Sequence, residues 1–204
     1  MFKFQTRQIA VTGILFAITI ILGSTGIGFI PIPPLKLTIM HIPVIIASII
    51  EGPLVGGLNG LLFGLFSMFQ AATNPTPVSF IFLNPIVAIV PRIFIGIVPY
   101  YAYKIIKTKK DKLNLSISIL LGSFTNTIGV MGLIYILYLN EYAKAIGISI
   151  ESAKKIIDVY ILNGFISGSV SIMIALPVIL TVRKNRKKHF IKPYFELKQV
   201  LNSC

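Results

Sequence analysis

Residues 71–95 read AATNPTPVSFIFLNPIVAIVPRIFI, and this stretch decides how the fold is interpreted. Two proline breaks, Asn74–Pro77 and Asn84–Pro85, precede an apolar run that contains one charged side chain, Arg92. A guanidinium stays charged at any physiological pH and resists burial in hydrocarbon. Arg92 therefore needs a partner, which is another side chain, a lipid phosphate or a bound anionic solute.

The composition around this stretch is that of a membrane protein. Of 204 residues, 55% are hydrophobic and only 12% are charged, so one soluble core would leave much apolar surface in water. The net charge of +13 comes from short basic blocks between apolar runs, which is typical of cytoplasmic anchors and not of a nucleic-acid interface. We expect a multi-pass protein of a prokaryotic-type plasma membrane, embedded in the lipid bilayer and without a nucleic-acid partner.

Six apolar segments are separated by breaks and charged blocks. The predicted membrane helices are Ile9–Ile30, Leu37–Ile50, Leu54–Gln70, Ile86–Tyr103, Leu115–Tyr138 and Ile156–Val182. The second segment has 14 residues and, at about 1.5 Å per residue, covers only about 21 Å of a hydrocarbon core about 30 Å thick. It is therefore either a short span or half of a re-entrant hairpin.

Glycine and proline mark the connections between these segments. The stretch Gly23–Lys36 predicts a loop or partly unwound lid at one membrane face, because proline removes a backbone donor and glycine loosens the backbone. Residues 140–155 predict an amphipathic connector outside the hydrocarbon. Within the third segment, Gly56, Gly60 and Gly64 recur every four residues on one helical face, a stripe that permits close helix packing.

The basic residues orient the bundle. Six segments place both termini on one side, and short positively charged loops favour the cytoplasm. The Lys104–Lys112 loop with its five lysines, the N-terminus and the Arg183–Lys188 cluster all fall on that side. The predicted fold is an all-α integral membrane protein, a bundle of six transmembrane helices with cytoplasmic N- and C-termini. Residues 1–188 form the membrane domain, and residues 189–204 form a short cytoplasmic tail with a surface helix.

With this orientation, polar side chains gather in the outer half of the bundle. Arg92 lies about 10 Å from Pro85 on the outside and about 18 Å from Lys104 on the inside. The inner half carries small residues instead, so we expect an outward-facing solute pocket and an inward helix-packing surface. The candidate substrate-binding residues are Arg92, His41, Gln70, Asn74, Asn84, Asn126, Tyr135 and Asn163.

Each candidate also has a purely structural interpretation. Arg92 can reach headgroup phosphates or pair with Glu141. His41 can be satisfied by a neighbouring carbonyl group, and Asn126 and Asn163 can hydrogen-bond across helices. Both interpretations stay open from the residues alone.

Motifs for enzymatic chemistry are missing from the sequence. There is no G-x-x-x-x-G-K-[ST] nucleotide loop, no H-E-x-x-H zinc motif and no G-x-S-x-G nucleophile elbow. The two histidines, His41 and His189, are too far apart for a histidine metal cluster, and no acid, base and nucleophile set stands out. We expect no enzymatic activity, cofactor or metal, so the energy for pumping a solute must come from another protein.

Three blocks of sequence resemble a known family. In order along the chain they are LTIMHIPVIIASIIEGPLVGGLNGLLFGLFSMFQAATNP, PRIFIGIVPYYAYK and LGSFTNTIGVMGLIYIL. Over roughly Arg7 to Arg183 the chain resembles the substrate-binding S components of energy-coupling factor (ECF) vitamin transporters, most closely the pantothenate-type branch.

This resemblance implies a six-helix protein that binds a vitamin with high affinity near the outer face. It implies delivery of the vitamin with a transmembrane coupling subunit and two cytoplasmic ATPases. Gly13 and Ala17 match the small-x-x-x-small motif that contacts the coupling subunit in this family. The lids over the pocket would be Gly23–Lys36 and Ala71–Ser79. For pantothenate, Arg92 is the natural carboxylate partner, because a guanidinium offers paired donors.

The predicted function is therefore the high-affinity substrate-binding subunit of an ECF-type, ATP-driven vitamin importer, with pantothenate as the preferred solute. One alternative is an S component for another vitamin, such as folate, riboflavin or lipoate. The other is a six-helix membrane scaffold protein that binds no solute.

Overall fold

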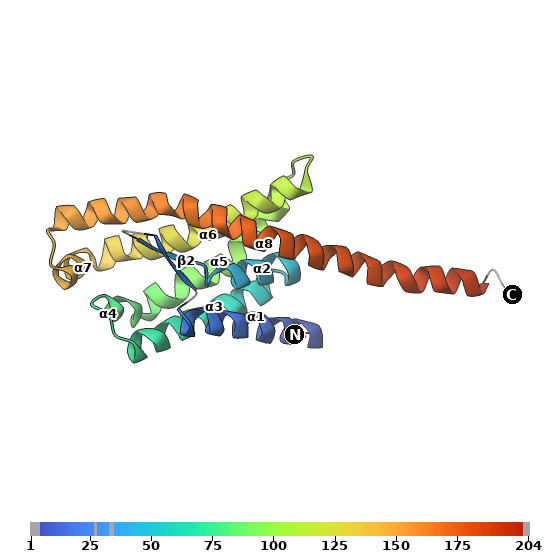
Figure 1. Ribbon diagram of the computed structural model, residues 1–204, viewed down its shortest axis with the longest axis horizontal. Coiled ribbons are helices and arrows are strands. Elements are labelled where there is room, and N and C mark those ends of the chain that lie inside the picture. The colour runs from blue at the N-terminus through green and yellow to red at the C-terminus, as the bar shows by residue number, and fades with distance from the viewer. Residues whose placement is uncertain (1–4, 27, 33–34, 202–204) are drawn as a thin grey trace.

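The computed structural model describes residues 5–26, 28–32 and 35–201, with the side chains in these ranges except at 29–37 and 186–201. Figure 1 shows a bundle of helices with one short hairpin. The elements are α1 (Thr6–Ser24), β1 (Phe29–Ile32), β2 (Leu35–Thr38), α2 (Ile42–Glu51), α3 (Pro53–Thr73), α4 (Ser79–Phe82), α5 (Pro85–Ile105), α6 (Asp111–Leu137), α7 (Leu139–Ile146) and α8 (Ile150–Leu201).

Five helices in the described part of the chain are long and apolar enough to cross a membrane. They are α1, α3, α5, α6 and the Ile150–Asn185 part of α8. The other apolar helix, α2, has 10 residues and rises only about 15 Å, so it is too short to span. The predicted segment Leu37–Ile50 is thus no continuous helix: its start belongs to β2, and the helix begins at Ile42.

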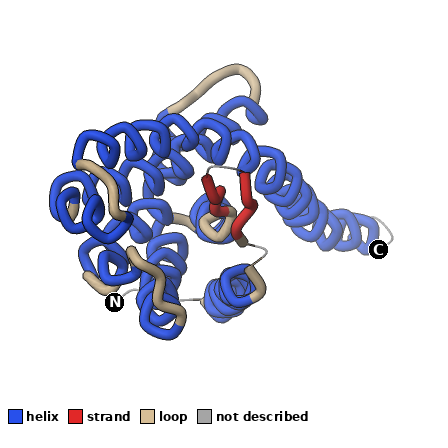
Figure 2. Tube along the Cα trace, turned by 60° about the vertical axis from the view of Figure 1, so that its left-hand side comes forward, coloured by secondary structure: helices blue, strands red, loops and turns tan. Residues whose placement is uncertain are grey.

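The hairpin formed by β1 and β2 is an element that the all-α prediction did not include. The strands are antiparallel, with Phe29 opposite Thr38 and Ile32 opposite Leu35. At its base, the Ile39 N–H donates to the Gly28 carbonyl oxygen at 2.9 Å. Figure 2 shows both strands surrounded by helices in that view, and β2 lies against α8. The predicted lid Gly23–Lys36 is thus partly a hairpin, although its residues 27, 33 and 34 lie outside the described ones.

The helices α3, α5, α6 and α8 pack each against the next, and α2 lies inside this arrangement. Residues 42–49 of α2 are all buried, with Ile45 fully enclosed. A second cluster of buried side chains, around Ile81 of α4 and Val87 of α5, joins these two helices to α6 and α8. Large apolar side chains are exposed on the outer helix faces, as expected where lipid replaces water.

The predicted glycine stripe is confirmed as the contact between α3 and α5. A Cβ atom at Gly56 would collide with the carbonyl oxygen of Gly96, and one at Gly60 would collide with the carbonyl oxygen of Arg92. At Gly64 a Cβ atom would lie 2.8 Å from the Ala88 carbonyl oxygen. Backbone-to-backbone contact of this kind requires small residues. It sets the position of the α5 backbone that carries Arg92.

A tight turn joins α2 to α3 and is tied to α1. Its single linking residue, Gly52, has φ 100° and ψ 176°, a conformation that is essentially restricted to glycine. Beside it, a carboxylate oxygen of the buried Glu51 side chain lies 3.0 Å from a guanidinium nitrogen of Arg7. The turn therefore holds three helices together at one end of the bundle.

The two ends of the bundle are formed by different segments of the chain. In Figure 1 the N-terminus, the α5–α6 loop and the C-terminal part of α8 lie toward one end, and α4 and α7 lie toward the other. The predicted connector at residues 140–155 is α7, a turn at Gly147 and the first residues of α8. In the structure α8 continues without a break into the predicted tail, whose residues 202–204 lie outside the described part.

Candidate functional site

The position of Arg92 depends on the proline that precedes it in α5. Pro91 has no N–H group, so it leaves the carbonyl oxygen of Val87, four residues earlier, without its helical hydrogen bond. The Nη1 atom of Arg92 donates to that oxygen at 2.7 Å. The sequence Pro-Arg inside a helix therefore supplies both a free acceptor and the donor that satisfies it, which orients the guanidinium.

The Arg92 side chain is 6% exposed, and its guanidinium carbon lies 5.7 Å from the ring centre of Phe63 and 5.5 Å from that of Phe82. Its Nε is buried and has no hydrogen-bond partner in the described part of the chain. Of the ion pairs between described residues none includes Arg92, and Glu141 is exposed on α7. At this burial the guanidinium does not extend to lipid headgroups. Its contacts among the described residues are the Val87 carbonyl oxygen and the two phenylalanine rings.

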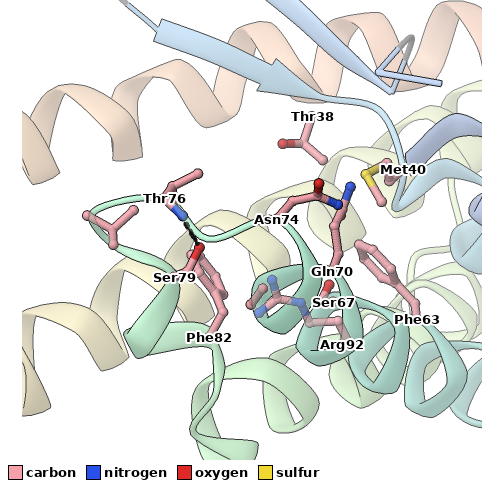
Figure 3. Close-up of a pocket in the computed structure, with 12 residues that line it drawn as sticks. Thr38, Met40, Phe63, Ser67, Gln70, Asn74, Thr76, Ser79, Phe82 and Arg92 are labelled. Atoms are coloured by element: carbon pink, nitrogen blue, oxygen red, sulfur yellow. Dashed lines mark hydrogen bonds between the residues drawn. The ribbon is translucent and has the colours of Figure 1, made fainter. Parts of the chain in front are cut away.

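A cavity of about 500 Å³, here called the large lobe, opens beside Arg92. Figure 3 shows Thr38 of β2 on one side of it and Arg92 on the other, with Gln70 and Asn74 between them. Its apolar wall includes Met40, Phe63 and Phe82. The lining residues are Thr38, Met40, Phe63, Ser67, Gln70, Ala71, Asn74, Thr76, Val78, Ser79, Phe82 and Arg92.

A second cavity of about 140 Å³, here called the small lobe, lies toward α6 and α8. It shares Thr38, Phe63, Phe82 and Arg92 with the large lobe, so Arg92 borders both. Its own lining residues are Asn126, Thr127, Val130, Met131, Tyr160, Asn163, Gly164 and Ser167.

The structure brings five of the candidate residues to the two lobes. Gln70 lines the large lobe and donates from Nε2 to the Gly23 carbonyl oxygen at 2.8 Å, which links α3 to the end of α1. Asn74 lines the large lobe at the exposed end of α3. Asn126 and Asn163 line the small lobe, and Arg92 borders both lobes.

The other three candidates line neither lobe. The His41 Nε2 atom lies 3.1 Å from the Ser123 hydroxyl and 3.0 Å from the Ser171 hydroxyl in a fully buried cluster that joins α2, α6 and α8. Asn84 is the N-cap of α5. Tyr135 is 43% exposed on α6.

Several lining residues are not among the sequence candidates. Thr38 comes from a strand, although it lies in the predicted second membrane segment Leu37–Ile50. Phe63 looks like any core residue of an apolar helix. Phe82 precedes the Asn-Pro pair that starts α5, and this short helix before a second break is the one signal that marks it. Tyr160 and Ser167 each lie about one turn from Asn163 on α8, one before it and one after it, so a helical-face argument from Asn163 would have found them.

The role of Asn84 as a helix cap leads to a stability prediction. Its Oδ1 accepts from the Ile86 N–H at 2.9 Å, and its Nδ2 donates to the Tyr138 hydroxyl at 2.7 Å. Asn84→Ala should lower the free energy of unfolding by about 2 kcal/mol, about 1 from the cap and about 1 from the second bond. Asn84→Ser keeps a capping oxygen and should lose only about half as much.

Thermal unfolding of the purified variants, with Tyr138→Phe alongside, measures these losses. Tyr138→Phe removes the same hydroxyl contact without touching the cap, so it should match Asn84→Ser. Ligand affinity should change by no more than about twofold in all three, since Asn84 borders neither lobe. A large loss of affinity in Asn84→Ser with unchanged stability would place Asn84 on the ligand instead.

A bundle of apolar helices with a cavity beside a buried cation that has no ion-pair partner among the described residues has the arrangement of a solute-binding transport protein. Residues 7–183 match the family described as ECF transporter, substrate-specific component, and the chain belongs to this family. It is similar to the pantothenic acid transporter PanT of Lactococcus lactis subsp. cremoris, with 33% identity over 153 residues, 67% of this chain and 76% of that protein. It is also similar to the pantothenate transporter PanT of Leuconostoc mesenteroides subsp. mesenteroides, with 30% identity over 137 residues, 62% of this chain and 67% of that protein.

Membership of this family confirms the resemblance drawn from the three sequence blocks. The chain is a multi-pass protein of the cell membrane and a substrate-specific component of an ECF transporter, and the family consists of transport components, not enzymes.

Proposed function

We propose that this chain binds pantothenate with high affinity in the lobes around Arg92 and delivers it as the substrate-binding subunit of an ATP-driven ECF importer. The names of the two relatives support pantothenate as the solute. The observation that carries the proposal is the state of Arg92, which is buried, borders both lobes and pairs with no carboxylate in the described part of the chain. A guanidinium in that state has its strongest partner in a carboxylate from outside.

The remaining contacts come from the polar residues that line the lobes. Gln70, Asn74, Asn126 and Asn163 offer amide donors and acceptors to the hydroxyl and amide groups of pantothenate. The apolar wall formed by Phe63, Phe82 and Met40 suits its dimethyl-substituted carbon. A scaffold protein without a solute has no need for a cavity of about 500 Å³ beside a buried charge.

The proposed partners are a transmembrane coupling subunit and two cytoplasmic ATPases. Gly13 and Ala17 lie exposed on α1, and a Cβ atom at Gly13 would meet no described atom within 4 Å. This open face of small residues suits close approach of another helix. The proposed orientation puts both termini and the Lys104–Lys112 loop in the cytoplasm, supported by their common end of the bundle in Figure 1.

Transport in a reconstituted system tests this function. Proteoliposomes that contain this chain with the coupling subunit and both ATPases of its own organism should accumulate radiolabelled pantothenate when they enclose ATP, and not when they enclose ADP. Gly13→Leu should retain pantothenate binding but lose assembly and uptake, because a large side chain occupies the proposed contact face. Equal uptake with ATP and ADP, or none from an assembled complex, would contradict the proposal.

A further inference from the structure

The two lobes differ in how their polar side chains are engaged. In the large lobe, Gln70 donates to the Gly23 carbonyl oxygen, and the Ser79 hydroxyl accepts from the Thr76 N–H at 2.7 Å. Asn74 donates to the Thr73 hydroxyl at 3.3 Å. Most polar groups of the large lobe therefore already have partners within the protein, and much of its remaining wall is apolar.

In the small lobe, four polar side chains have no hydrogen-bond partner among the described residues, whereas the Thr127 hydroxyl donates to the Ser123 carbonyl oxygen at 3.4 Å. Among described residues, the side chains of Asn126, Tyr160, Asn163 and Ser167 make no hydrogen bond, and the Oδ1 atom of Asn126 is buried. The Nε atom of Arg92 is in the same state. Buried polar groups without partners are costly, most of all within a membrane bundle, and they mark a place that a polar group is meant to fill.

The lobes also differ in size. The small lobe, at about 140 Å³, has room for a compact group, whereas the large lobe, at about 500 Å³, has room for a branched body. The small lobe offers the Arg92 guanidinium, two amide groups and the four hydroxyl groups of Thr38, Thr127, Tyr160 and Ser167. Every side chain of this set can donate a hydrogen bond. A carboxylate, which accepts only, matches such a set.

We propose that the small lobe is the anion subsite, which takes the carboxylate end of the solute between Arg92, Asn163 and Ser167, while the body of the solute fills the large lobe. This inference rests on the proposed function and adds the direction in which the solute lies. It assigns the solute a slim, unbranched acid end and a bulkier, partly apolar opposite end. Selection for the acid then depends on Arg92 of α5 and on α8, and not on the residues of the α3–α4 loop.

Comparing the affinities for two ligands distinguishes the contribution of the acid end from that of the rest of the solute. Pantothenate and panthenol share their body and differ in that panthenol carries CH₂OH in place of the carboxylate. The ratio of their dissociation constants measures how strongly the protein selects the acid. Wild-type protein should bind pantothenate at least about 30-fold more tightly than panthenol, because panthenol leaves the buried Arg92 unpaired.

A matched pair of serines then locates the acid end. Ser167 lies in the small lobe and Ser67 in the large lobe, and neither side chain makes a hydrogen bond to a described residue. Ser167→Ala and Asn163→Ala should each weaken pantothenate binding by about tenfold, the effect of one hydrogen bond to a charged group. Panthenol binding should fall by less than about threefold, so the ratio shrinks. Ser67→Ala should leave the ratio unchanged.

Isothermal titration of the variants with both ligands, with thermal unfolding of ligand-free samples to verify folding, gives these ratios. An unchanged ratio in Ser167→Ala and Asn163→Ala, or a ratio that shrinks in Ser67→Ala instead, would overturn the orientation and leave the proposed function standing. Wild-type protein that binds neither ligand would overturn the proposed function itself. Should Asn163→Ala fail to fold, Ser167→Ala with Ser67→Ala as its control still decides the matter.

Discussion

Replacing Arg92 with methionine should weaken pantothenate binding by at least about 30-fold, because breaking one side of a desolvated charge pair costs about 2 to 5 kcal/mol. Methionine keeps an unbranched apolar body between Phe63 and Phe82 and removes the charge. Arg92→Lys should fall between wild type and Arg92→Met, since an ammonium keeps the charge but not the paired donors. Isothermal titration measures the three affinities.

Arg183→Met is the matched control for this experiment. Arg183 is also a partly buried arginine, on α8, but it donates to the Tyr103 hydroxyl at 2.7 Å and lies 3.9 Å from an Asp111 carboxylate oxygen, away from both lobes. Its loss should lower the melting temperature and change pantothenate affinity by no more than about twofold. Equal loss of affinity in Arg92→Met and Arg183→Met would mean that general destabilisation, and not the charge at the lobes, explains the effect.

The second large effect concerns the contact between α3 and α5. Gly60→Ala should lower the free energy of unfolding by about 3 kcal/mol or more, because its Cβ atom would collide with the carbonyl oxygen of Arg92, and neither backbone can move without moving its helix. The same displacement shifts Arg92 relative to the lobes. Pantothenate affinity should therefore fall as well, even though Gly60 lines neither lobe.

Gly132→Ala provides the comparison, since a Cβ atom there would meet no described atom within 4 Å. In the middle of α6 this change should leave stability unchanged or raise it by about 0.5 to 1 kcal/mol, the usual advantage of alanine in a helix. Thermal unfolding of the ligand-free proteins in one detergent compares the two. Stability of Gly60→Ala at or above that of Gly132→Ala would show that the stripe is not a tight contact.

The helical part of the fold follows from the sequence because lipid imposes simple rules. Apolar segments about 20 residues long predict helices, and four-residue glycine spacing predicts a close contact. These rules fail for α2 and the hairpin. Residues 29–36 read as a loop because prolines interrupt any alternation, and residues 37 and 38 read as the start of the second membrane segment. Hydropathy alone does not separate a short helix buried in the bundle, such as α2, from one that faces lipid.

The candidate site was predictable in outline. Arg92 stands out because it is a single charged residue in an apolar run. Its predicted depth in the membrane groups it with Asn126 and Asn163, which line the same lobe. The depth of a residue in the membrane does not tell which way its side chain points. His41 lies at the predicted depth, yet its ring bonds to Ser123 and Ser171 and lines neither lobe. Asn84 carried a readable signal, since asparagine followed by proline is typical of a helix N-cap and first turn.

Titration of the purified wild-type protein with pantothenate, folate, riboflavin, thiamin, biotin and lipoate tests the central claim most directly. We predict one saturable site for pantothenate, at one molecule per chain, with no comparable binding of vitamins that lack a carboxylate, such as thiamin and riboflavin. Folded protein that gives no binding signal with pantothenate, or that binds thiamin or riboflavin more tightly, would contradict the assignment of Arg92 as the partner of a carboxylate.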